Sequence, residues 1–282
     1  MLSTLKTMVA SVRESRVKSQ PWTQNENYVH EAPSVQQTLD IFEGAWSSVL
    51  PFENVAAGAS RLFDDDRIKW MLDQLGDVAG WDVLELGPLE GGHSFMLEQA
   101  GARHIEAVDA NKTAYLKCLV IKELLGLKAA HFVLGDFDEV LRSSQKRYDL
   151  IVASGVLYHM ADPLVTLQNM TRLSDRIFIW SHFFDEVAMP ANDPRRRPIT
   201  GEVTKRTVEG DTLTYHSRSY LNNQGESKFC GGSQSKSVWL EREETIALLR
   251  NKGYDVTSAF DEPDHQNGPS VCLLAQKRVV LD

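Results

Sequence analysis

Val83-Leu84-Glu85-Leu86-Gly87-Pro88-Leu89-Glu90-Gly91-Gly92 is an apolar run that breaks into a glycine turn, which predicts a strand passing directly into a helix. Two further apolar runs, 105–109 and 132–136, each end on an acid, Asp109 and Asp136. Glycine has no Cβ, so the backbone of such a turn can approach a ligand closely. Acids at successive strand ends suit a ligand that carries a ribose, an adenine and an ammonium group.

The composition of the turn argues against a phosphate site. A dinucleotide site requires Gly-x-Gly-x-x-Gly, so that a helix N-terminus can hold a pyrophosphate, but the residue two after Gly87 is Leu89. The turn also lacks the Gly-Lys-Ser/Thr that cradles a triphosphate. Glu85 and Glu90 flank the turn, and their carboxylates would repel phosphate and favour a cation.

Strands and helices alternate from Trp81 to His182, which is typical of an α/β fold with a parallel sheet and right-handed crossovers. The strands are expected near 82–87, 104–109, 130–135, 148–154, 175–181, 254–260 and 270–277. The helices are expected near 91–100, 112–125, 138–144, 163–173 and 241–252. Gly268-Pro269 separates the last two strands and predicts a connection of hairpin type.

Two segments outside this alternation predict appendages to a core at 79–182 and 238–282. Helix-period apolar spacing over residues 2–12, 35–50 and 64–75 predicts an N-terminal helical cap at 1–78. A stretch without helical pattern then follows the fifth strand, and a structureless loop of that length is uncommon. We therefore expect a substrate-covering insertion at 183–237, with a small hairpin over 203–220.

The chain continues with Tyr148-Asp149-Leu150-Ile151-Val152-Ala153-Ser154-Gly155-Val156-Leu157-Tyr158-His159, followed by Asp162-Pro163-Leu164. Together with the glycine turn and the strand-end acids, this set resembles the class I S-adenosylmethionine-dependent methyltransferases, over about residues 80–182 and 238–278. The last motifs are most similar to the branch with the tRNA wobble-uridine carboxymethyltransferases and their small-molecule relatives. That branch commonly has a Gly-Cys-Gly turn, whereas this chain has Gly-Pro-Leu-Glu-Gly, so the resemblance is carried over to the cofactor and not to a tRNA substrate.

The resemblance implies a Rossmann-like, seven-stranded, mostly parallel sheet with helices on both faces and an antiparallel final strand. It also implies S-adenosyl-L-methionine as the cofactor, with its methionine part at the glycine turn and its ribose hydroxyls on Asp109. Asp136 would hold the adenine amino group with Phe137 against the ring, and 154–159 would lie beneath the reacting sulfur. The implied cofactor-binding set is Glu85, Gly87, Pro88, Leu89, Gly91, His93, Asp109, Ala110, Asn111, Asp136, Phe137, Ser154, Gly155 and Tyr158.

Two histidines follow the fourth and fifth strands, at the edge where open α/β sheets bind ligands. We expect His159 or His182 to act as the catalytic base for a hydroxyl acceptor, because imidazole titrates near neutrality. Activity should then rise with pH through a value of about 6–7. A structural hydrogen bond is the alternative for each histidine.

The expected substrate contacts are Tyr158, Trp46, His182 and Arg197. Core packing is the alternative for Tyr158 and for Trp46, which is expected at the end of an N-terminal helix, and a solvated turn is the alternative for Arg197. His93 could contact the cofactor or lie on the surface. No metal site is expected, because no zinc-ligand spacing is present.

The charge balance bears on the acceptor. The 282 residues carry a net charge of −9, whereas proteins that track phosphates usually have a basic field. Three scattered cysteines form no disulfide framework, which favours a cytoplasmic location. The sequence also lacks an apolar run of membrane-spanning length, and a homodimer is compatible with it.

The sequence thus predicts methyl transfer to an oxygen or nitrogen of a small molecule. Two alternatives stay open at this point. One is a tRNA-modifying methyltransferase or carboxymethyltransferase, which would need a basic face. The other is a nucleoside-binding regulatory protein that holds the cofactor without turning it over.

Overall fold

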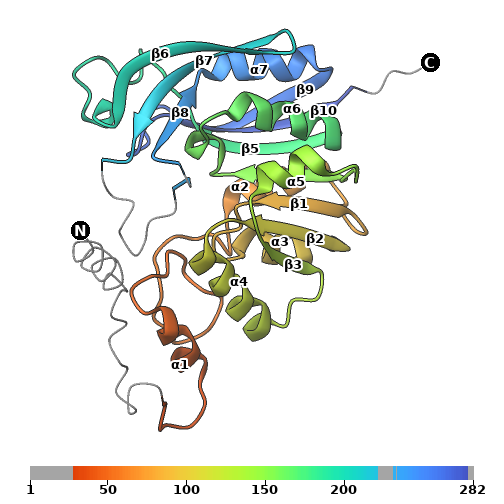
Figure 1. Cartoon of the computed structure of the whole chain (residues 1–282). Coiled ribbons are helices and arrows are strands. Elements are labelled where there is room, and N and C mark those ends of the chain that lie inside the picture. The colour runs from red at the N-terminus through yellow and green to blue at the C-terminus, as the bar shows by residue number, and fades with distance from the viewer. Residues whose placement is uncertain (1–27, 222–230, 233, 279–282) are drawn as a thin grey trace, which may run out of the picture.

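The computed structural model describes residues 28–221, 231–232 and 234–278, and among these residues two sheets form, one large and one small (Figure 1). The helix expected over residues 2–12 lies outside the described residues. Within the described residues no helix is both long enough and apolar enough to cross a membrane.

Seven strands of the described chain form the large sheet in the order β3-β2-β1-β4-β5-β10-β9. The strands from β1 to β5 run parallel, and β10 is antiparallel to both of its neighbours, β5 and β9. The Rossmann-like prediction is therefore confirmed, including the antiparallel final strand. The bounds are β1 Asp82–Leu86, β2 His104–Asp109, β3 Ala130–Leu134, β4 Leu150–Ser154, β5 Arg176–His182, β9 Tyr254–Glu262 and β10 Ser270–Lys277.

Helices cover both faces of this sheet, as predicted. On one face α2 (Asp66–Leu75), α3 (Gly92–Gln99) and α4 (Lys112–Leu125) pack around Val83 and Val152. On the other face α5 (Phe137–Ser143), α6 (Pro163–Leu173) and α7 (Arg242–Asn251) pack around Leu84 and Ile151. Adjacent residues of β1 and β4 thus serve opposite cores, because successive side chains of a strand point to opposite faces.

The position of β1 between β2 and β4 determines where ligands should bind. The chain first winds outward from β1 to β2 and β3, and then crosses back to β4 and β5 (Figure 1). This reversal is the topological switch point, and open α/β sheets bind ligands beyond the carboxyl ends of the strands that meet there. The turn 87–91 and the segment 155–159 both leave the sheet at this edge.

The N-terminal segment is less helical than expected. The helix predicted over 35–50 ends early, with α1 (Val35–Leu39) followed by a short 3-10 helix η1 (Asp40–Phe42). Gly44 then adopts a positive φ of 73°, and the chain continues without helical structure. The expectation that Trp46 ends a helix is therefore wrong, because the backbone has already left the helical region at Glu43, three residues earlier.

The predicted hairpin is present and belongs to a small antiparallel sheet in the order β6-β7-β8. Its strands are β6 (Ile199–Val208), β7 (Asp211–Ser219) and β8 (Lys236–Leu240). The sequence did not predict β8, which spans the expected boundary at residue 238. Figure 1 shows the small sheet beside α6 and α7, at the end of the large sheet that carries β9 and β10.

The segment between β5 and the end of β8 begins and ends at neighbouring positions. The backbone N–H of Phe184, just beyond β5, donates to the carbonyl oxygen of Leu240 at the end of β8, at 2.8 Å. On the way back, Val238 N–H donates to Met160 O at 3.0 Å, which attaches β8 to the short 3-10 helix η2 (Leu157–His159). The small sheet is thereby fixed against the carboxyl ends of β4 and β5.

Candidate functional site

The glycine turn after β1 is tight and conformationally demanding. Gly87 and Gly91 have positive φ values of 64° and 78°, and Leu89 between them adopts 54°, which is uncommon for a residue with a side chain. A Cβ on Gly87 would lie 2.8 Å from a methyl carbon of Val156, and one on Gly91 would lie 2.9 Å from the ring of Phe132. The turn therefore requires glycine at both positions, and such clustered strain is typical of a ligand site.

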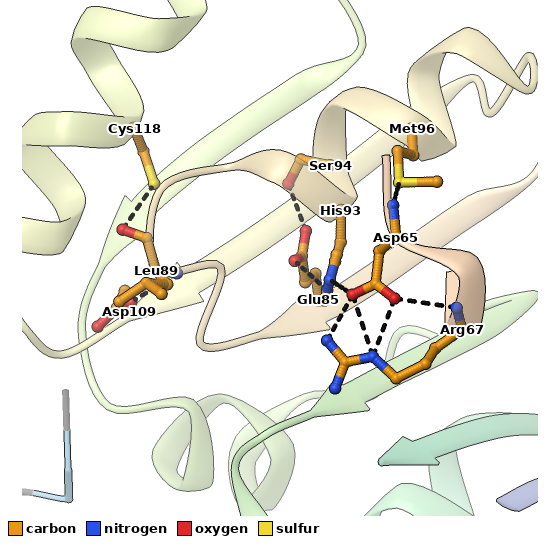
Figure 2. A network of polar contacts seen from close by, with 9 residues as sticks. All are labelled: Asp65, Arg67, Glu85, Leu89, His93, Ser94, Met96, Asp109 and Cys118. Atoms are coloured by element: carbon orange, nitrogen blue, oxygen red, sulfur yellow. Dashed lines mark hydrogen bonds and ion pairs between the residues drawn. The ribbon is translucent and has the colours of Figure 1, made fainter. Parts of the chain in front are cut away.

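Asp109 at the end of β2 is held against this turn. Its Oδ2 accepts a hydrogen bond from Leu89 N–H at 3.3 Å (Figure 2). Its Oδ1 accepts one from Asn111 N–H at 2.7 Å. Burial raises the pKa of Asp109, against the opposing effect of these two backbone bonds. Asn111 uses its side-chain oxygen to cap α4, where it accepts from the backbone N–H groups of Thr113 and Ala114.

Glu85 near the end of β1 is fully buried, and its carboxylate faces the side chains of Ser94 and His93 (Figure 2). Ser94 donates a hydrogen bond to Glu85, and His93 Nδ1 lies 3.9 Å from its Oε1. Burial raises the pKa of Glu85, and the negative charge of Asp109 adds to this rise. Two acids at neighbouring strand ends thus share a site in which an added positive charge would stabilise both carboxylates.

His93 is buried, so the surface role considered from the sequence is excluded. Its Nε2 lies 3.0 Å from Oδ2 of Asp65, the residue that caps α2. Burial alone would raise the pKa of Asp65, but hydrogen bonds from His93 and Arg67 hold it well below the usual range. His93 therefore links the carboxylate of β1 to the start of α2 (Figure 2).

Glu90 does not face the candidate ligand site, contrary to the expectation from the sequence. It is completely buried, and its Oε1 accepts a hydrogen bond from Lys117 Nζ at 2.7 Å. Its two oxygens also accept from the backbone N–H groups of Ser47 and Ser48, each at 2.8 Å. The positive charge beside Glu90 is thus that of Lys117 and not of a ligand. Through Glu90, the N-terminal segment is bonded to the glycine turn.

Trp46 belongs to the same buried junction. Its indole N–H donates to Leu39 O at 2.8 Å. Its ring lies edge-on to that of Phe42, with the two ring centres 5.8 Å apart. Only 3% of its surface is exposed. The structure therefore favours the packing alternative for Trp46, and its contact with substrate stays a prediction.

Aromatic rings gather where β4 and β5 end. Ser154 and Gly155 lead from β4 into η2. Gly155 adopts a φ of 85°, and a Cβ on it would lie 3.6 Å from both the Trp180 ring and the Tyr158 hydroxyl. The Tyr158 ring lies edge-on to the rings of His182 and Trp180, with distances between ring centres of 4.7 Å and 5.9 Å. The structure thus brings together Tyr158 and His182, two residues predicted from the sequence.

His182 has a defined proton position. Its Nδ1 lies 2.8 Å from the carbonyl oxygen of Gly268, which can only accept, so Nδ1 carries the proton and Nε2 keeps the lone pair. The ring stacks on Trp239 at 5.3 Å with an interplanar angle of 13°. Burial lowers the pKa of His182 to about 4, so the imidazole is neutral at pH 7.

His159 is arranged differently. Its Nδ1 lies 3.1 Å from the hydroxyl of Tyr220, which itself accepts a hydrogen bond from Gly232 N–H at 2.9 Å. Tyr220 can therefore donate to Nδ1 and occupy its lone pair. Burial, with a contribution from the charge of Arg218, lowers the pKa of His159 to about 3. Neither histidine has the pKa near 6–7 that the sequence suggested, because His182 is buried and the imidazole of His159 is also largely desolvated by its neighbours.

The remaining predicted residues lie further from these rings. Asp136 is exposed and caps α5 through a hydrogen bond from Asp138 N–H at 2.9 Å, and Phe137 is half-buried against the core. Arg197 is exposed just after the 3-10 helix η3 (Pro194–Arg196), which agrees with the solvated-turn alternative. Pro88 lies within the glycine turn, and Ala110 directly follows Asp109.

Two arginines that the sequence did not single out lie among the aromatic rings. The guanidinium carbon of Arg67 lies 4.2 Å from the ring centre of Trp180. That of Arg218 lies 5.1 Å from the Tyr220 ring and 5.8 Å from the Trp239 ring. The one available sequence signal for Arg218 was its place two residues after His216 in an alternating strand, which puts both side chains on one face.

Comparisons with known proteins agree with this fold. Residues 77–209 match the family model described as "Methyltransferase domain". The chain is 28% identical over 110 residues to the tRNA U34 carboxymethyltransferase of Idiomarina loihiensis, covering 37% of this chain and 33% of that protein. It is 31% identical over 102 residues to that of Marinobacter nauticus, covering 35% and 31%. The chain thus spans about a third of the length of these curated relatives.

Solved structures are similar over most of the chain. The N-terminal domain of EvdMO1, solved in the presence of SAH and D-fucose, is 18% identical with a TM-score of 0.63, covering 86% of this chain and 96% of that one. Magnesium protoporphyrin IX methyltransferase from Synechocystis PCC 6803, solved with bound SAH, is 14% identical with a TM-score of 0.53, covering 90% and 92%. At these identities the similarity establishes the fold.

Proposed function

Because the chain belongs to the class I S-adenosylmethionine-dependent methyltransferases, we propose that it transfers a methyl group from S-adenosyl-L-methionine to an oxygen or nitrogen of a small molecule. One observation carries the proposal: Glu85 and Asp109 are two acids of raised pKa that flank a glycine turn with no room for a Cβ. A cationic nucleoside would lower the free energy of both carboxylates.

We assign the parts of the cofactor to the residues that fit them. The turn 87–91 and Glu85 would hold the methionine part, and Asp109 would accept hydrogen bonds from the ribose hydroxyls. Asp136 still has an oxygen free of the α5 cap for the adenine amino group, beside Phe137. When bound, S-adenosyl-L-methionine supplies an electrophilic methyl group, so that the protein supplies position and, for a hydroxyl acceptor, a base.

His182 is the better candidate for that base. With its proton fixed on Nδ1 by Gly268, its Nε2 lone pair can accept a proton from an acceptor hydroxyl. Nδ1 of His159 is instead paired with the Tyr220 hydroxyl. Tyr158, edge-on to His182, is well placed to contact the acceptor.

A small acceptor is supported by the charge and by the small sheet over the strand ends. The net charge of −9 is unfavourable for a polyanion. The first of the similar structures was solved with SAH and D-fucose, which is a small hydroxylated molecule. We also propose a cytoplasmic location, supported by Cys118 and Cys272, which are both free and buried.

A tRNA substrate is the second candidate, and the similarity to tRNA U34 carboxymethyltransferases over about a third of their length favours it. A gel-shift experiment with bulk tRNA at about 0.15 M salt separates the candidates. We expect no retained complex at micromolar protein, and a salt-dependent complex would reverse the ranking.

Calorimetry tests the cofactor directly. S-Adenosylmethionine and S-adenosylhomocysteine should bind, whereas NAD and ATP should not, and the opposite pattern would refute the proposal. A protein that binds the cofactor but yields no methylated product from any extract fraction, by mass spectrometry, would instead be the non-catalytic nucleoside-binding protein.

A further inference from the structure

We propose that Arg218 binds a carboxylate of the acceptor, on the face of the small sheet that meets the end of β5, and that the physiological acceptor is therefore a carboxylic acid. This inference rests on the proposed function, because it concerns the second substrate of the same reaction.

The starting observation is that two of the three guanidinium nitrogens of Arg218 are buried without a hydrogen-bond acceptor. Nε and Nη1 of Arg218 are inaccessible to water, and among the residues that the structure describes neither atom has a hydrogen-bond acceptor. Burying a charged donor without compensation is strongly unfavourable. Other arginines of the described chain are paired with carboxylates, including Arg67 with Asp65, Arg195 with Asp193 and Arg242 with Asp261.

Two more polar groups without partners share the face of Arg218. In the register of β7 and β8, Arg218 lies opposite Ser237, and Trp239 follows two residues later. Opposite residues of antiparallel strands, and residues two apart on one strand, point to the same face. The Ser237 hydroxyl and the Trp239 indole N–H are both buried, and within the described ranges both also lack a hydrogen-bond partner. Within the described residues, three side chains on this face therefore carry buried polar atoms that can donate hydrogen bonds and have no hydrogen-bond partner.

The local electrostatics point to an anion as the missing partner. Burial lowers the pKa of Arg218, and the groups that oppose this shift are Tyr220 and Tyr158, neither of which is a carboxylate. The two histidines nearby cannot supply negative charge. A carboxylate accepts charge-assisted hydrogen bonds from a guanidinium, and these are stronger than hydrogen bonds between neutral groups.

The position of Arg218 fits the second substrate better than the cofactor. Its guanidinium lies over the ring of Trp239, and that ring stacks on His182, the candidate base. Gly268 permits this stack, because a Cβ there would lie 2.4 Å from the Trp239 ring. The glycine turn and Asp109, in contrast, follow β1 and β2 on the other side of β4. A carboxylate on Arg218 would thus direct the rest of the acceptor toward His182.

Benzoate is a suitable probe, because it combines a carboxylate with a ring that can stack on the aromatic side chains, and benzamide is its neutral analogue. Both are titrated by calorimetry into the full chain saturated with S-adenosylhomocysteine. We expect benzoate to bind with a Kd of about 10 mM or tighter, and benzamide to bind at least about tenfold more weakly. Arg218→Gln should weaken benzoate about tenfold or more, and Arg218→Lys should retain part of the affinity, because it keeps the charge.

The control variant is Lys205→Gln, which removes one exposed positive charge from the same hairpin and should leave benzoate binding unchanged. Affinity for S-adenosylhomocysteine should be equal in all variants, which also shows that each is folded. Equal binding of benzoate and benzamide, equal loss in the Lys205 variant, or no benzoate binding to the loaded protein overturns the inference and leaves the proposed function intact. Failure to bind S-adenosylhomocysteine at all overturns both.

Discussion

The ammonium of Lys117 lies 2.7 Å from the carboxylate of Glu90, and both side chains are buried, so that an ion pair joins α4 to the glycine turn. The same ammonium donates to Ala45 O at 2.6 Å, and the same carboxylate holds the backbone of Ser47 and Ser48. The buried pair therefore attaches the N-terminal segment to the glycine turn.

Breaking this pair should destabilise the protein strongly. Lys117→Met leaves Glu90 buried without its counter-charge, and we expect a loss of about 3–5 kcal/mol in the free energy of unfolding. Lys236→Met is the matched control, because it removes an exposed lysine whose partner Glu202 is 3.9 Å away, and it should cost less than about 1 kcal/mol. Urea titrations measure both, and equal losses would contradict the role given to the pair.

Gly87→Val should abolish cofactor binding. The new side chain would meet Val156, and the φ of 64° disfavours any residue with a Cβ. Gly126→Ala is a control for the backbone effect alone, because Gly126 has a φ of 66° and no atom lies within 4 Å of the position that its Cβ would take. Calorimetry with S-adenosylhomocysteine should show loss of binding for the first variant and normal affinity for the second.

Asp109→Ala should weaken the cofactor by about 1–3 kcal/mol, the scale for the loss of a charge-assisted hydrogen bond. The raised pKa of Asp109 adds a pH dependence. The carboxylate of Asp109 takes up its proton at a higher pH than an ordinary aspartate does. On acidification, the affinity for the cofactor should therefore begin to fall at a higher pH than it would for an aspartate of ordinary pKa. Isothermal titrations at decreasing pH test this, and an identical pH profile for the Asp109 variant would argue against it.

His182→Gln should lower turnover by about 10²-fold or more on a hydroxyl acceptor and spare cofactor affinity, whereas His159→Gln should have a smaller effect. Because the pKa of His182 is lowered to about 4, turnover in the wild type should be nearly constant from weakly acidic to neutral pH. The sequence had instead predicted that turnover would rise with pH through about 6–7. Wild-type turnover in both variants would mean catalysis by positioning alone.

Acid should destabilise the fold through the same histidine. The pKa of His182 falls from 6.5 to about 4 in the folded protein, so the unfolded chain binds the proton more tightly. The stabilisation is present above pH 6.5 and is lost as pH falls toward 4, at about 2 kcal/mol between neutral pH and pH 5. Urea unfolding should show a smaller acid-induced loss in His182→Gln, and an unchanged loss would exclude His182 as a cause.

The large sheet was predictable because its signals are local. The apolar run 83–86, the turn at Gly87 and the strand-end acid Asp109 are each readable within a few residues. The strand β8 was not, because its five residues gain their structure from pairing with β7, whose last residue lies 17 positions earlier. Strand propensity depends on such neighbours more than helix propensity does.

Parts of the candidate site were unpredictable for the same reason. Glu90 flanks the turn in sequence, but its partner Lys117 is 27 residues away and turns it from the ligand. The low pKa values of His159 and His182 come from burial, which residue type does not report. Arg218 stands out only once the register of β7 and β8 places it with other unpaired donors.

The hydrogen bond between Phe184 N–H and Leu240 O brings the two ends of the segment between them together beyond β5, and Tyr215 and Asp211 within it bond to Asp162 and Gln168 at α6. A chain that departs and returns at one point can change in length or composition at a cost that grows only slowly with its length. The strands that carry Glu85 and Asp109 need not move when it does. If this segment contacts the acceptor, as we propose, transplanting residues 185–239 between relatives should change the acceptor while the residues proposed to bind the cofactor stay the same.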